Sequence, residues 1–246
     1  MAITKKLSFG RKRAKKQRGK FIVVEGIDGS GKTTQARLLA ETLAEYGYSV
    51  ETIKFPQYGT KSAGMVEEYL NGKYGQVGAH AASIFYAIDR FDASVKIRQW
   101  LDEGKFIVCD RYVLTNAAHQ GGKISDRTDR VKFYKWLDNL EYTIFGIPKP
   151  DLNIILHVDA SVAQKLVDGH TKGERKYIKG KKRDLHEADL NHLQNAEKVY
   201  IEIAKLFPNT KLIECMAGRD IMPVKQIHNK VWEMVRRVAL KNELPR

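Results

Sequence analysis

The chain has 246 residues, of which 43% are hydrophobic and 29% are charged. This length suffices for one well-buried core and excludes a small scaffold held together by disulfides. No apolar run approaches the ~18 residues that a membrane-spanning helix needs, so we expect a soluble protein. The two cysteines, Cys109 and Cys215, lie in strand-like apolar segments, which favours reduced thiols in a cytoplasmic protein over a disulfide.

The formal net charge of +14 is concentrated at the N-terminus. Residues 1–20 hold nine of the 43 Lys and Arg residues and no acid, which leaves 34 basic against 29 acidic residues in the rest. Because residues 1–19 lack helical apolar periodicity, their like charges predict a solvated, disordered tail. A weak, salt-sensitive contact with a polyanion is the alternative, and a transit sequence is disfavoured because no amphipathic face forms.

From residue 20 onward, short β-branched runs alternate with longer segments of helical periodicity. The runs cover residues 21–25, 50–55, 106–110, 153–158 and 210–215. Such alternation is typical of a parallel sheet covered by helices, and we expect one α/β domain over residues 20–246.

Four apolar stripes predict helices that bury one face in the core. The first two stripes end before glycines, Gly47 and Gly104, that are typical of helix termini. The stripes consist of Ala36, Leu39 and Leu43; of Ile84, Ile88, Phe91 and Val95; of Leu190, Leu193, Tyr200, Ile203 and Phe207; and of Ile227, Val231, Val235 and Val238.

A glycine-rich motif directly follows the first predicted strand. Residues 26–33 read GIDGSGKT and match the phosphate-loop pattern G-x-x-x-x-G-K-[ST], followed by a predicted helix. Backbone N–H groups at this helix N-terminus can bind phosphate oxygens, and Lys32 adds positive charge. The Thr33 hydroxyl can ligate Mg²⁺, and Thr34 can contact the α-phosphate side. The motif therefore predicts nucleotide binding.

Three further segments point to an acceptor for a phosphoryl group. Tyr86 and Arg90 lie four residues apart, opposite the stripe of the second helix. Asp110 and Arg111 end a predicted parallel strand, where open α/β sheets bind ligands. Residues 170–183 hold seven Lys and Arg residues, interrupted by glycines, as in a mobile cationic cover. Taken singly, these features are also compatible with an exposed helix face, a strand-end ion pair and a solvated loop.

The order of these motifs resembles that of thymidylate kinases, a family of phosphate-loop nucleoside monophosphate kinases. The matching segments are EGIDGSGKTT at 25–34, FPQYGT at 55–60, YAIDR at 86–90, DRYVLTNAAHQGG at 110–122, PDLNIILHVD at 150–159 and RDLHE at 183–187. The resemblance implies a P-loop NTPase-type, five-stranded parallel sheet flanked by helices, with a basic lid at about 170–185. It also implies transfer of the ATP γ-phosphate to dTMP with Mg²⁺, and a homodimer.

The resemblance further implies roles for individual residues. Asp28 is expected to bind the acceptor sugar, Tyr86 to stack on the thymine, and Tyr112 to lie beneath the sugar. Arg90 is expected to face the base and the nearby phosphate. The ATP phosphates are assigned to Gly26, Gly29, Ser30, Gly31, Lys32, Thr33 and Thr34; the magnesium shell to Thr33 and Asp110; the acceptor phosphate to Arg111; and further acceptor contacts to Phe55, Thr115, Asn116 and Gln120.

Two segments depart from the family pattern. Gly29 stands where some members carry an arginine, so we expect the lid to neutralise transition-state charge through Arg175 and Arg183, supported by other lid lysines. Gln57 and Tyr58 stand where an arginine usually contacts the acceptor phosphate; Lys61 is one candidate replacement, and Arg90 with Arg111 is the other.

Two other functions stay open from the sequence. A deoxynucleoside kinase needs a base for its substrate hydroxyl and favours a carboxylate at the end of the second strand, which here reads Lys54-Phe55-Pro56. A non-catalytic, nucleotide-dependent nucleic-acid-binding protein would combine the phosphate loop with the basic tail. No NKxD-type segment indicates a GTPase, and no histidine receives a catalytic role.

Overall fold

The computed structural model describes residues 18–169 and 190–241. Most of the predicted tail and the predicted lid, including Arg175 and Arg183, lie outside these residues. Arg18 and Gly19, which we assigned to the tail, contact the domain: Arg18 pairs with Asp151 at 3.2 Å, and the Gly19 N–H donates to the Leu101 carbonyl at 2.8 Å.

A parallel sheet of five strands forms the centre of the molecule, with the order β2-β3-β1-β4-β5. The strands are β1 (Phe21–Glu25), β2 (Val50–Lys54), β3 (Phe106–Asp110), β4 (Leu152–His157) and β5 (Thr210–Glu214). Every residue of β1 and β3 is buried, as expected for strands covered on both faces. The predicted fold class is confirmed, and so are the buried, free thiols of Cys109 and Cys215.

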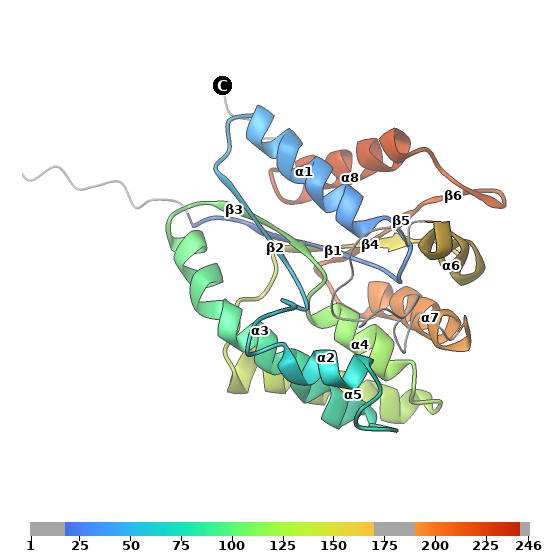
Figure 1. The fold of residues 1–246 in the computed structure, drawn as a ribbon. Coiled ribbons are helices and arrows are strands. Elements are labelled where there is room, and N and C mark those ends of the chain that lie inside the picture. Colours follow the sequence, from blue (N-terminus) through green and yellow to red (C-terminus); the bar gives the residue numbers. More distant parts are fainter. Residues whose placement is uncertain (1–17, 170–189, 242–246) are drawn as a thin grey trace, which may run out of the picture.

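Helices cover both faces of this sheet (Figure 1). On one side lie α1 (Lys32–Glu45) and α8 (Val224–Val238). On the other lie α2 (Gly64–Leu70), α3 (Ala79–Asp102), α4 (Val113–Gly121), α5 (Arg127–Asp138) and α7 (Leu190–Leu206). A π-helix, η1 (Asn139–Ile144), continues α5, and α6 (Ala160–Gly169) follows β4.

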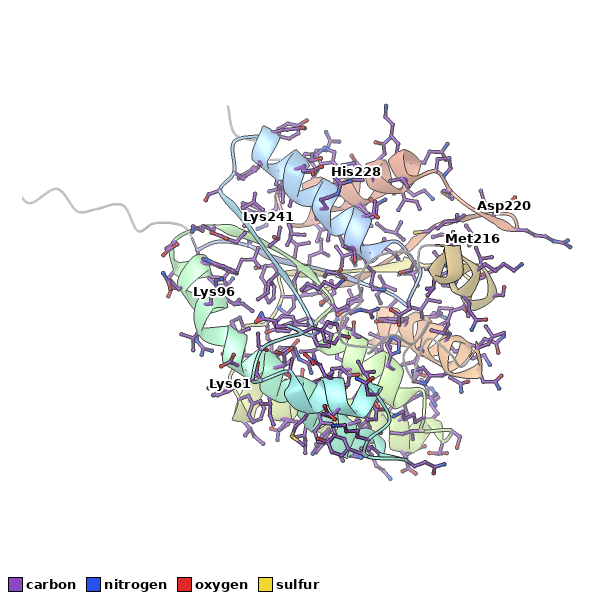
Figure 2. All side chains as sticks on the ribbon, viewed as in Figure 1. Lys61, Lys96, Met216, Asp220, His228 and Lys241 are labelled. Atoms are coloured by element: carbon purple, nitrogen blue, oxygen red, sulfur yellow. The ribbon has the colours of Figure 1, made fainter. Side chains whose placement is uncertain are left out.

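A short hairpin extends from the body of the molecule between β5 and α8. It consists of β6 (Met216–Ala217) and β7 (Asp220–Ile221), and Figure 2 shows Asp220 near its tip. No helix within the described ranges is long and apolar enough to cross a membrane.

The predicted burial of the apolar stripe on α3 is wrong. Ile84, Ile88, Phe91 and Val95 are 39%, 39%, 48% and 66% exposed. The face of α3 that packs inward instead carries small and polar residues, among them Ala82, Ser83, Ala87, Asp89, Arg90, Ala93 and Ser94. Small side chains let α3 approach its neighbours closely. Arg90 lines the cavity described below, whereas Asp89 accepts from the Gln57 N–H and the Ser62 hydroxyl. The other three stripes lie mainly in the core, and Gly47 and Gly104 end their helices at φ +82° and +75°.

Candidate active site

The phosphate loop connects β1 to α1 at the carboxyl edge of the sheet. Gly31 adopts φ +83° immediately before α1, and Gly29 adopts φ +84°. A Cβ atom at Gly29 would lie 2.1 Å from the Ala163 carbonyl oxygen of α6, so no side chain fits there. This contact explains physically why position 29 cannot carry the arginine that some family members have.

Lys32 is almost completely buried beneath the loop. Its Nζ donates to the Ile27 carbonyl at 2.6 Å, so the side chain folds back toward the start of the loop. Burial, together with repulsion from Arg111, lowers the pKa of Lys32 from its ordinary value to about 8. A phosphate anion would favour the protonated form, so the loop is suited to an anionic ligand.

Thr33, Asp110 and Lys54 meet beside the loop. The Thr33 hydroxyl donates to Asp110 Oδ2 at 2.5 Å. Lys54 Nζ lies 3.6 Å from the same carboxylate oxygen and 3.4 Å from Thr33 Oγ1. The parallel register pairs Lys54 of β2 with Asp110 of β3, so adjacent strand ends bring these side chains together.

A cavity of about 1060 Å³ runs from the phosphate loop across this edge of the sheet. Of the predicted site residues that the structure describes, all line it except Gly26, Asp110 and the candidate Lys61. Gly26 lies in the loop with φ +140°, and Asp110 contacts the cavity through Thr33. The cavity lies at the upper end of the range of about 300–1,000 Å³ that is usual for small-molecule pockets.

One end of the cavity holds the predicted acceptor residues of α3 and α4. Arg90 is 2% exposed and donates from Nε and Nη2 to both oxygens of Glu141, with Nε distances of 3.0 and 3.1 Å. Asn116 Nδ2 donates to the Ser83 carbonyl at 3.1 Å, which joins α4 to α3. Tyr86 also lines this end, so the predicted ring and guanidinium do share a face.

The opposite end of the cavity is apolar. Its lining comes from α6, the β7 region and α8, and comprises Leu166, Val167, Ile221, Met222, Val224 and Ile227. Gln35 of α1 joins this wall by donating to the Val224 carbonyl at 3.0 Å. Figure 1 shows α8 and α3 on opposite sides of the sheet, so the cavity passes from one layer of helices to the other.

The loop after β3 connects the two ends. Arg111 adopts φ +71°, a left-handed conformation, and its guanidinium pairs with Asp28 of the phosphate loop. The Tyr112 N–H donates to Glu25 at 2.9 Å, and its fully buried ring lines the cavity. The predicted convergence of Lys32, Arg90 and Arg111 on one space is therefore confirmed.

Sequence reasoning missed several residues of this site. Lys54, Glu67 and His119 line the cavity, whereas Glu25 and Glu141 are wholly buried and act from behind it. Glu25 directly precedes the phosphate loop, a position that could have signalled its importance. Glu141 lies in a π-helix, which periodicity cannot indicate. Lys61, our candidate for the acceptor phosphate, is exposed and does not line the cavity.

A phosphate loop at the carboxyl edge of a parallel sheet, opening into a cavity that extends well beyond the loop, is the arrangement of a nucleotide kinase of the phosphate-loop class. Comparison with known proteins gives the family. The sequence profile of thymidylate kinases matches residues 24–229. The chain belongs to the thymidylate kinase family.

Relatives and solved structures agree with this membership. The chain is 31% identical to a thymidylate kinase of Mycobacterium tuberculosis, over 75% of this chain and 85% of the relative. It is 30% identical to a probable thymidylate kinase of Pyrococcus abyssi, over 91% and 98%. The solved thymidylate kinase of Candida albicans superposes with a TM-score of 0.67 at 25% identity, covering 93% of this chain and 96% of that one.

Proposed function

We propose that the protein transfers the γ-phosphate of MgATP to dTMP, giving dTDP and ADP, with the phosphates meeting beside Lys32. The observation that carries this assignment is the single cavity joining the phosphate loop to the polar pocket of Tyr86, Arg90 and Asn116. The apolar end around Met222 supports a site for the adenine base. Membership of the thymidylate kinase family supports dTMP over thymidine or another monophosphate as acceptor.

Thr33 and Asp110 fit a magnesium ion. Mg²⁺ prefers oxygen ligands, and both residues offer oxygens within one hydrogen bond of each other. Asp110 Oδ1 is buried and makes no hydrogen bond within the described part of the chain, so it keeps an acceptor for a cation or its water. When bound, Mg²⁺ neutralises charge on the donor phosphates.

The other residues bind and align the two substrates. An acceptor phosphate is anionic near neutral pH, so the protein needs no strong base and must instead hold the acceptor oxygen in line with the γ-phosphorus. Lys32 and the loop N–H groups hold the donor. Arg90, held by Glu141, and Arg111, held by Asp28, line the cavity on the proposed acceptor side and help to position that substrate. Arg175 and Arg183 of the predicted lid are proposed to complete the charge balance.

A panel of acceptors tests the assignment. We expect ADP release with MgATP to be fastest for dTMP, slower for dUMP, and negligible for AMP, GMP, CMP and thymidine. Lys32→Ala should abolish turnover while circular dichroism shows a folded protein. Turnover led by AMP or GMP would contradict the acceptor, and turnover of thymidine without dTMP would favour a deoxynucleoside kinase.

We also propose that the protein is a homodimer, with a second copy covering the exposed stripe of α3. The exposed apolar surface continues beyond α3: the ring centroids of Phe91 and Phe145 lie 5.2 Å apart, and the neighbouring Ile144 is 65% exposed. Apolar patches of this kind mark interaction sites. Phe91→Lys should yield monomers in light scattering after gel filtration, whereas Lys96→Glu on the same helix serves as the polar control. A wild-type monomer would contradict the proposal.

We also propose that the protein is located in the cytoplasm. It is supported by the two buried, unpaired thiols of Cys109 and Cys215.

A further inference from the structure

The acceptor side of the cavity needs a cation that the sequence pattern does not supply. Gln57 and Tyr58 stand where the family resemblance leads us to expect a phosphate-binding arginine. Within the described residues, the cations lining the cavity are Lys32, Lys54, Arg90 and Arg111. Their surroundings decide which of them has charge available for an acceptor phosphate.

Three of these cations are already committed. Arg90 is buried against Glu141, and Arg111 pairs with Asp28, so a carboxylate offsets each guanidinium. Lys32 belongs to the phosphate loop and faces the donor. By contrast, the Lys54 side chain is 53% exposed. Its Nζ makes only long contacts, of 3.6 Å with Asp110 Oδ2 and 3.4 Å with Thr33 Oγ1.

The position of Lys54 overlaps with that of the donor's metal ion. Its ammonium contacts the Thr33 hydroxyl and the Asp110 carboxylate, the two groups that fit Mg²⁺. Two cations cannot share these oxygens without strong repulsion. Binding of Mg²⁺ with ATP at these oxygens would therefore displace the Lys54 ammonium from Asp110 and free it to contact a phosphate anion.

We propose that Lys54 is a ligand of the acceptor phosphate and that MgATP binding releases it for this role. The inference rests on the proposed function. The flexible four-carbon stem of lysine allows the ammonium to move between two anionic partners. Lys54 is thus a substrate-binding residue that replaces the missing arginine, and it couples the two substrates: the protein binds dTMP more tightly once MgATP is present.

Calorimetric titrations test this coupling without catalysis. dTMP and thymidine are titrated into the protein with and without AMP-PNP and Mg²⁺. We expect the nucleotide analogue to tighten dTMP binding by about 10-fold, the effect of one charge-assisted hydrogen bond. Thymidine has no phosphate, so its affinity should not change.

Variants of Lys54 and a matched lysine make the test specific. Lys54→Met should lose the tightening for dTMP and leave thymidine binding as in the wild type; because the residue is half exposed, the variant should fold, as thermal unfolding will verify. Lys54→Arg should keep the effect. Lys61→Met alters an exposed lysine of the loop that precedes α2, labelled in Figure 2, and should behave as the wild type.

The outcomes separate the inference from the function on which it rests. Equal tightening of dTMP in the wild type and in Lys54→Met would overturn the role of Lys54 alone. A wild type that binds neither dTMP nor thymidine would contradict the proposed function, and the role of Lys54 would fall with it.

Discussion

The buried ion pair between Arg90 and Glu141 offers the sharpest test of how the acceptor pocket is built. The Arg90 and Glu141 side chains are 2% and 0% exposed, so the charge of each depends on the other. Glu141→Gln keeps the volume of the side chain but removes its charge. The Arg90 guanidinium then remains almost completely buried without the carboxylate that accepts its hydrogen bonds.

The expected loss of stability is large for a single substitution. Breaking a buried ion pair by removing one partner costs about 3–5 kcal/mol. Glutamine keeps one acceptor oxygen for Arg90 Nε, so we expect a loss of about 3 kcal/mol in the free energy of unfolding, measured with urea. Since whole domains have only about 5–15 kcal/mol of stability, the midpoint should shift clearly. Arg90 also loses its fixed orientation, so the KM for dTMP should rise by about tenfold, equivalent to about 1.4 kcal/mol.

The surface pair of Arg37 and Glu41 provides the matched control. Its side chains are 60% and 51% exposed, so Glu41→Gln should change the unfolding free energy by at most about 0.5 kcal/mol. If Glu141→Gln were as mild as Glu41→Gln in stability and left the KM for dTMP unchanged, the pair would not hold Arg90 in place and the reasoning would be refuted.

Three further predictions concern the phosphate loop and the sheet edge. Because Lys32 has a pKa of about 8 and phosphate favours its charged form, binding of an ATP analogue near pH 8.5 should take up a proton, measured by calorimetry in buffers of different ionisation enthalpy; no uptake would contradict the shift. The hydrogen bond to Glu197 helps raise the pKa of His157 to about 9, so protonated His157 stabilises the folded state fully below pH 6.5 and no longer does so once the pH has risen through 9. After allowance for solvent screening, the free energy of unfolding should fall by about 1–2 kcal/mol over this pH range, and His157→Gln should abolish that part of the pH dependence. Gly29→Ala should abolish binding of the ATP analogue, because its Cβ meets a carbonyl, whereas Gly47→Ala, at nearly the same φ but with open space, should cost only about 1 kcal/mol of stability and bind normally.

The sequence predicts the sheet better than its covering layers. All five predicted strands are present within one residue of their expected ends. Their β-branched runs are short and bounded by turns. Those of β1 and β3 are also buried throughout, so local composition and burial agree there. The helices α2 and α5 have no long apolar stripe, and a π-helix breaks the usual periodicity at residues 139–144. The positions and ends of these helices depend on tertiary packing, which a local sequence pattern cannot predict.

The error on α3 has a specific cause. Periodicity identifies which residues share a helix face but not which face points inward. The larger aliphatic and aromatic side chains of Ile84, Ile88, Phe91 and Val95 suggested the core, yet the inward face holds alanines, serines and the charged pair Asp89 and Arg90. The inward face carries polar groups beside the cavity and small side chains where neighbouring helices approach closely, so the larger apolar side chains lie on the exposed face.

Several predicted site residues come together because their motifs lie at strand ends, where a parallel sheet collects them, whereas Tyr86 and Arg90 reach the cavity from α3. The residues that the sequence did not reveal act through pairing: Lys54 through its register with Asp110, and Glu141 through contact with Arg90 across the fold. Such partners are far apart in the chain, so no spacing rule connects them.

Glu25 shows how the two halves of the site depend on one another. It is the last residue of β1 and wholly buried, and burial raises the pKa of its carboxyl above the ordinary value. One oxygen accepts from the Tyr112 N–H, and the other accepts from the Thr115 hydroxyl and from Tyr200 of α7 at 3.3 Å. The carboxylate therefore joins the start of the phosphate loop to the loop and helix that carry the proposed acceptor residues. If the phosphate loop and the proposed acceptor pocket moved apart, the Tyr112 N–H and the Thr115 and Tyr200 hydroxyls would each lose a buried hydrogen-bond partner. The network therefore favours a fixed distance between the two substrates, which in-line transfer requires.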